Sequence, residues 1–241
     1  MLRGKGNYRI ERWFAGQVSL ATVRPLGASD PLPAVAIFHG FEGEKSDHLL
    51  RLAVPLADAG CLAVLPDAAL HEERGPDDFA VRFREDHDGL ILDSLGRTVE
   101  EAGSILSWVA DREDVDEARI GVVGISTGGA VALALSCRES PSAPKTAVAL
   151  MPTTPEPGSA DRREAAYAPD PAACFPTALL IVHGAQARSA PSANARTFYD
   201  ALIPHYSAAP ERLRFVDMPG EGHGVGEYCI EETLAWLARF L

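Results

Sequence analysis

The sequence predicts an α/β fold with a mostly parallel central sheet, helices on both faces and an antiparallel hairpin at the N-terminus. Short apolar runs, several without polar alternation, are separated by longer segments with helical spacing of apolar residues. Uninterrupted apolar runs are typical of parallel strands covered on both faces. Strand–helix alternation implies right-handed crossovers, and such sheets bind ligands beyond the carboxyl ends of their strands. Functional residues are therefore expected at that edge.

The strands follow one another along the whole chain. Segments around Tyr8–Phe14 and Gln17–Arg24 are expected to form the hairpin, with its turn at Ala15-Gly16. Six further strands are predicted at Ala34–Phe38, Leu62–Leu65, Ile120–Ile125, Thr146–Met151, Ala178–Val182 and Leu213–Asp217.

Four helices lie between these strands or after them. Ser46–Ala59 begins with a capping residue and ends at Gly60, and a helix of small residues spans Val131–Ser136. Two others show one apolar stripe each. The stripes consist of Ile91, Leu95, Val99, Ala102, Leu106 and Val109, and of Ile230, Leu234, Leu237 and Leu241.

Length and composition indicate one ordinary globular domain over residues 1–241. The net charge of −12 argues against nucleic acid or an anionic membrane as the main partner. No apolar run is as long as a membrane span, and the start lacks the apolar block of a secretory signal. We expect free thiols in a reducing cytoplasm, because no CxxC pair occurs among the four cysteines, Cys61, Cys137, Cys174 and Cys229. The stretch from Pro152 to Pro176, rich in Pro, Ala and charge, is either a small lid or a long surface loop.

The strongest motif is Gly124-Ile-Ser-Thr-Gly128, a G-x-S-x-G pattern with an apolar strand before it and a helix after it. This context is the one in which a strained turn presents a nucleophilic serine, here Ser126. The helix N-terminus behind the turn directs free N–H groups at developing negative charge. In this architecture the loop after an early strand supplies an oxyanion-hole N–H, which we assign to Phe41, with Thr127 as the second donor. His39, in the same loop, is expected to shape it rather than to transfer protons.

A base for Ser126 is expected on a loop after a late strand. His223 fits this position, because it lies between glycines and between the final strand and the final helix. His183 also follows a strand, but its His-Gly step is interpreted as the exit from that strand.

Several motifs together resemble the α/β-hydrolase superfamily, specifically its small bacterial carboxylesterases near dienelactone hydrolases and prolyl-oligopeptidase-like catalytic domains. They are His39-Gly-Phe41 with Lys45, Leu65-Pro-Asp-Ala68 with His71–Gly75, Gly124–Gly128, Phe198-Tyr-Asp200, His205-Tyr-Ser207 with Pro210–Leu213, and Gly222-His-Gly224. The resemblance covers nearly the whole chain. It implies catalytic roles for Ser126 and His223 and backbone donors at Phe41 and Thr127.

The resemblance does not supply the acid of the catalytic triad. The family usually has an aspartate three residues after the glycine of the His-Gly step, and Ala187 occupies that position here. Glu156 or Asp161 is a candidate substitute from another loop, whereas Glu221 is too close to His223 in sequence to point readily at the same ring. Otherwise a Ser-His dyad works slowly, or the protein has become a binding protein. In well-studied serine proteases, losing the acid costs roughly four powers of ten in turnover.

These observations predict an ester or thioester hydrolase that forms an acyl-enzyme and acts on a small acyl ester. No cofactor and no metal are implied. The alternative is a non-catalytic or weakly active protein of the same fold that binds a small ligand. A cysteine-based dienelactone hydrolase is a weaker interpretation, because the residue at the turn is serine.

Overall fold

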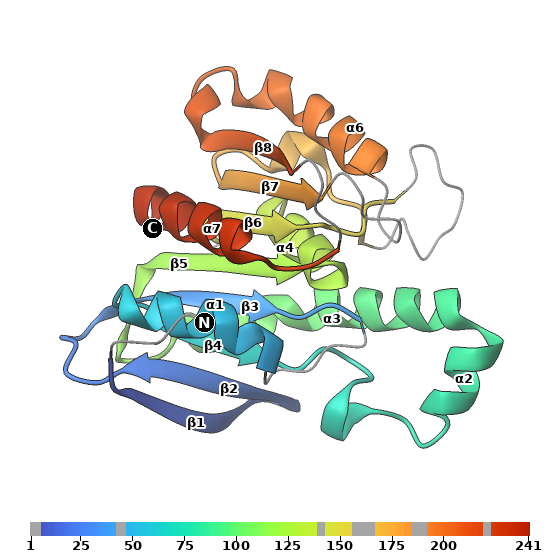
Figure 1. Ribbon diagram of the computed structural model, residues 1–241, viewed down its shortest axis with the longest axis horizontal. Coiled ribbons are helices and arrows are strands. Elements are labelled where there is room, and N and C mark those ends of the chain that lie inside the picture. The colour runs from blue at the N-terminus through green and yellow to red at the C-terminus, as the bar shows by residue number, and fades with distance from the viewer. Residues whose placement is uncertain (1–5, 42–46, 139–142, 156–166, 185–191, 219–222) are drawn as a thin grey trace.

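The computed structural model describes residues 6–41, 47–138, 143–155, 167–184, 192–218 and 223–241. Its described strands form one eight-stranded sheet in the order β1-β2-β4-β3-β5-β6-β7-β8 (Figure 1). β1 pairs with β2, and β2 with β4, in antiparallel fashion, and every other neighbouring pair is parallel. The strands are β1 (Tyr8–Ala15), β2 (Val18–Pro25), β3 (Leu32–Phe38), β4 (Leu62–Pro66), β5 (Val115–Ile125), β6 (Thr146–Leu150), β7 (Ala178–Gly184) and β8 (Leu213–Met218).

Helices cover both faces of the sheet, as Figure 1 shows. One face packs against α1 (Asp47–Asp58) and α7 (Glu227–Phe240), and the other against α3 (His87–Ala110), α4 (Thr127–Ser136) and α6 (Ser192–Leu202). Each face has its own apolar core, because neighbouring strand residues point to opposite sides. Val35 and Ile37 of β3 belong to the core under α1 and α7, for example, and Ala34 and Ala36 to the other.

Shorter helical segments connect these elements. α2 (Phe79–Glu85) comes directly before α3, and single 3-10 turns lie at η1 (Glu72–Arg74), η2 (Pro171–Ala173), η3 (Ile203–Tyr206) and η4 (Pro210–Arg212). No helix in the described parts of the chain combines the length and the apolar character that a bilayer crossing needs.

The structure confirms all eight predicted strands and the four predicted helices, with shifts of a few residues at their ends. The hairpin turn lies at Gly16-Gln17 rather than at Ala15-Gly16, because Ala15 and Val18 are cross-strand partners and Gly16 has a φ of 61°. The capping residue proposed at Ser46 lies outside the described residues. So does the middle of the stretch from Pro152 to Pro176, so the choice between lid and loop stays a prediction.

The expectation of four free thiols was wrong for one pair of cysteines. Cys137 and Cys174 are joined in a disulfide, whereas Cys61 and Cys229 are free and buried. Cys137 caps the C-terminus of α4 and Cys174 ends η2, so the bond ties the helix behind Ser126 to the segment that leads into β7. The hydroxyl of Tyr206 also donates to the carbonyl oxygens of Cys174 and Thr177, at 3.2 and 2.7 Å, which anchors this segment further.

Candidate active site

Ser126 lies in the sharp turn between β5 and α4, as the motif predicts. Its φ of 57° and ψ of −115° are uncommon for a residue with a side chain, and such backbone strain persists only where the surroundings enforce it. The N–H of Ser126 donates to the carbonyl oxygen of Leu150 at 2.9 Å, and its own carbonyl oxygen accepts from the N–H of Ala130 at 3.1 Å. Neighbouring strand β6 and helix α4 therefore hold the serine in a strained, partly exposed position.

The loop after β3 lies directly beside this turn. A Cβ atom built on Gly40 would lie 3.1 Å from the Cβ atom of Ser126 and 3.8 Å from its Oγ atom. A side chain at position 40 would thus compete for space with the serine, and glycine keeps the hydroxyl accessible. Phe41, the assigned oxyanion donor, is the next residue, and Thr127 is the first residue of α4. N–H groups in a first helical turn have no partner within the helix, so Thr127 has a donor available for a ligand.

His39 shapes this loop through both nitrogen atoms of its ring. The N–H of Ala68 donates to Nε2 at 3.0 Å, which leaves the ring proton on Nδ1, 2.8 Å from the carbonyl oxygen of Gly40. The ring is almost fully buried, with 3% of its surface exposed. His39 therefore joins the loop after β3 to the end of β4, in agreement with the structural role expected for it.

His223 lies in the connection between β8 and α7, also at the carboxyl edge of the sheet. Much of its surface reaches solvent, yet partial burial, and secondarily the electrostatic effect of His183, lower the pKa of His223 below its ordinary value. Such a histidine is neutral at pH 7 and able to accept a proton. No hydrogen bond joins Ser126 and His223 within the described residues. Proton transfer between these two side chains is therefore a proposal. Catalytic hydrogen bonds are often long before substrate binds.

The described residues do not include the candidates for the acid. Ala187, Glu156, Asp161 and Glu221 all lie outside them. His183, at the end of β7, is fully buried; its Nδ1 atom lies 3.0 Å from the carbonyl oxygen of Gly184, and its Nε2 atom has no hydrogen-bond partner in the described part of the chain. The group that orients His223 therefore stays open.

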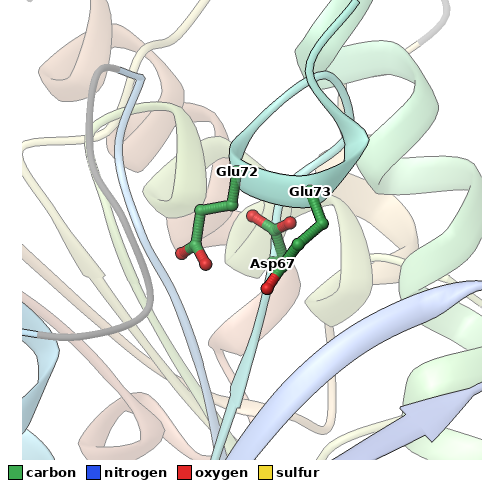
Figure 2. Close-up of side chains that lie close together, drawn as sticks. All are labelled: Asp67, Glu72 and Glu73. Atoms are coloured by element: carbon green, nitrogen blue, oxygen red, sulfur yellow. The ribbon is translucent and has the colours of Figure 1, made fainter.

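Three acidic side chains, Asp67, Glu72 and Glu73, lie close together after β4 and in η1 (Figure 2). Asp67 follows β4 and is almost fully buried, whereas Glu72 and Glu73 in η1 are exposed; one oxygen of each lies within 4.8 Å of the other two. Arg12 approaches Glu73 at 2.8 Å, and the ring of His39 lies 3.5 Å from Asp67. Oxygen ligands of this kind suit Ca²⁺ or Mg²⁺, but exposed acids beside a cationic partner are also an ordinary surface arrangement. The cluster is therefore not assigned as a metal site.

Comparisons with known proteins identify the family of the chain. Residues 20–203 match the model of the dienelactone hydrolase family. The chain is 30% identical over 239 residues to "Putative esterase YitV" of Bacillus subtilis, covering 87% of this chain and 90% of that protein. It is also 30% identical over 130 residues to the esterase YjfP of Escherichia coli, covering 54% of this chain and 50% of that protein.

Solved structures show the same fold. The crystal structure of TT1662 from Thermus thermophilus superimposes with a TM-score of 0.77 at 26% identity, covering 97% of this chain and 98% of that one. The sheet order, the serine turn and these matches identify the α/β-hydrolase fold. The chain belongs to the dienelactone hydrolase family.

Proposed function

We propose that the protein hydrolyses carboxylic esters through an acyl-enzyme formed on Ser126. The observation that carries this proposal is the strained backbone of Ser126 at the N-terminus of α4, with Gly40 leaving its hydroxyl accessible. Nucleophilic serines of this fold occupy such a turn, and two relatives of the chain are named esterases. Thioesters, which present a similar carbonyl group, are a second substrate type for the same site.

The proposed reaction uses four groups. The Oγ atom of Ser126 attacks the ester carbonyl carbon while His223 takes the hydroxyl proton, and the N–H groups of Phe41 and Thr127 stabilise the resulting oxyanion. His223 then returns the proton to the departing alcohol, which leaves an acyl group on Ser126. A water molecule, activated by His223, releases the carboxylic acid and restores the serine. The lowered pKa of His223 supports its role as the base at neutral pH.

The expected turnover number depends on whether another carboxylate replaces the missing aspartate. With Ala187 at the usual position of the acid, either a carboxylate from another loop orients His223, or a Ser-His dyad turns over slowly. A dyad with its oxyanion hole still accelerates the reaction well beyond water. The competing function, a binding protein without turnover, is favoured by the same alanine.

Hydrolysis of short p-nitrophenyl esters by the wild type, Ser126→Ala and Ala187→Asp tests the proposal. We expect activity in the wild type and a loss of about three powers of ten or more in Ser126→Ala, with an acyl-enzyme on Ser126 detected by mass spectrometry. A wild type without activity, or a Ser126→Ala variant as active as the wild type, would overturn the proposal at this site.

The Ala187→Asp variant separates the two versions of the mechanism. A large gain in turnover would show that the acid is missing from the natural protein. Unchanged turnover would show that another carboxylate already orients His223. Ala187→Asn is the matched control, because it has nearly the same size without the charge.

A further inference from the structure

We propose that the ester substrate has a bulky apolar acyl part, a phenyl ring or a group of similar size, which packs against Phe41, Phe79 and Phe83 beside Ser126. These three side chains are called the aromatic wall below. The inference rests on the proposed ester hydrolysis and assigns its substrate class.

The aromatic wall is an ordered cluster of rings. The ring centroids of Phe41, Phe79 and Phe83 lie 6.1 to 6.2 Å from one another, and the planes of Phe41 and Phe83 differ by only 4°. Phe79 and Phe83 occupy positions i and i+4 of α2, so both rings lie on one face of that helix. The loop after β3 supplies the third ring, and contacts between segments far apart in sequence thus build the wall.

The aromatic wall keeps part of its apolar surface open. All three phenylalanines are half-buried, and no residue of α2 is fully buried. In Figure 1, α2 projects beyond the carboxyl edge of the sheet instead of covering a face of it. An ion pair of 2.7 Å between Arg82 and Asp93 holds α2 to α3. The rings of the aromatic wall also pack against Leu90 of α3. Partly exposed aromatic side chains grouped beside a candidate active site are a common feature of ligand-binding sites.

The position of the aromatic wall connects it to the nucleophile. Phe41 directly follows Gly40, whose Cβ position would lie 3.1 Å from the Cβ atom of Ser126. Consecutive Cα atoms are about 3.8 Å apart, so the backbone of Phe41 begins one residue along the chain from the glycine that lies against Ser126. If the N–H of Phe41 holds the carbonyl oxygen, the acyl group attached to that carbonyl lies next to the side chain of the same residue.

The surroundings of the aromatic wall favour a neutral group. The ring of His71 meets Phe41 edge-on at 5.0 Å and is buried, with 6% of its surface exposed. Burial, the largest effect, lowers the pKa of His71, so this ring carries no charge at pH 7. On the other side, the exposed ring of His87 lies edge-on to Phe83 at 4.8 Å. Aromatic rings pack well both face to face with an offset and edge to face, which suits a phenyl group.

Methyl esters test the proposal, because their alcohol part contains no ring that would itself bind. The kcat/KM of methyl phenylacetate relative to that of methyl acetate is measured by proton release for the wild type, Phe79→Ala and Phe83→Ala. We expect the wild type to prefer phenylacetate. Each alanine variant should lower that preference about tenfold, through a higher KM for methyl phenylacetate. Val81→Ala is the matched control, because it removes an exposed apolar side chain from the same helix outside the wall.

Two further measurements keep folding and chemistry apart from binding. Phe79→Leu retains apolar surface without the ring and should recover most of the preference if Phe79→Ala folds poorly. Binding of methyl phenylacetate and of methyl acetate to Ser126→Ala, measured by calorimetry, tests the aromatic wall even if Ser126 is not the nucleophile. Equal affinity for the two esters, or the same preference in all folded variants, would overturn the inference. A Ser126→Ala variant that hydrolyses esters normally would instead overturn the proposed function.

Discussion

Gly124 and Gly128, which flank Ser126, pack so closely that a side chain at Gly124 would collide with Gly128, and the backbone of β3 leaves no room for a side chain at Gly128. A Cβ atom built on Gly124 would lie 1.9 Å from the carbonyl oxygen of Gly128. A Cβ atom on Gly128 would lie 2.2 Å from the carbonyl oxygen of Phe38. The strand before Ser126, the turn and the helix after it therefore pack backbone against backbone at these two glycines, with no side chain between them.

The first prediction follows from this contact. Gly124→Ala must displace backbone rather than a flexible side chain, so we expect it to lower the free energy of unfolding by about 3 kcal/mol and to abolish esterase activity. Urea unfolding of the two proteins measures the difference. Gly103→Ala is the control, because a Cβ atom there meets nothing within 4 Å inside helix α3, and it should stabilise by about 0.5 to 1 kcal/mol. Equal stability of Gly124→Ala and the wild type would contradict the geometry of the turn.

The second prediction concerns the pH dependence of hydrolysis. Partial burial and the nearby His183 lower the pKa of His223, so the neutral form persists to lower pH than in an ordinary histidine. We expect the acid limb of the kcat/KM profile to fall below pH 6.5, the unperturbed histidine value. In His183→Gln, which removes the second effect, the limb should move upward. An acid limb at or above pH 6.5 in the wild type would speak against His223 as the base.

The third prediction concerns stability and His71. Its pKa is lowered in the folded protein, chiefly by burial, whereas in the unfolded chain it returns to about 6.5. The unfolded state therefore binds more protons between the two values, and stability falls as the pH drops through 6.5 toward the folded pKa. Chemical unfolding at pH 7.5 and pH 5 should show this loss, and His71→Gln should show less of it. His87→Gln, at an exposed position, should behave like the wild type; an identical pH dependence in His71→Gln would refute this account.

The fourth prediction concerns the disulfide between Cys137 and Cys174. Thiol titration of the denatured, unreduced protein should find two thiols, and four after reduction. Reduction should lower stability by roughly 3 to 4 kcal/mol, because the bond closes a loop between residues 37 positions apart. Cys137→Ser should abolish this sensitivity to reductant, whereas Cys61→Ala should keep it. Four thiols before reduction would restore the expectation drawn from the sequence.

The sequence predicted the parts of the molecule that depend on local patterns. The apolar run before Ser126, its flanking glycines and the helix after it lie together in sequence, so strand, turn and helix could be predicted together. The helices α2 and α6 were missed. α2 is only seven residues long and none of them is fully buried, so its apolar pattern is too short to indicate a helix. In α6, Ala195 and Leu202 are fully buried and most of the other described residues are not.

Features that depend on tertiary contact were out of reach of sequence patterns. The disulfide joins cysteines whose spacing gives no signal, and the aromatic wall combines Phe41 with a helix far along the chain. Only the i, i+4 spacing of Phe79 and Phe83 offered a hint of it. The partner of His223 cannot be inferred from local sequence either, because any of several loops could bring a carboxylate to that edge of the sheet.

The order of the strands along the chain has a consequence for the synthesis of the protein on the ribosome. β3, β5 and β6, which enclose the serine turn, are complete long before the ribosome reaches β8, the strand at the edge that leads to His223. A chain that ends before β8 would lack His223, the proposed base, even if its serine turn had already formed. If the proposed reaction is right, the time at which a refolding sample first cleaves ester reports when β8 has joined the sheet.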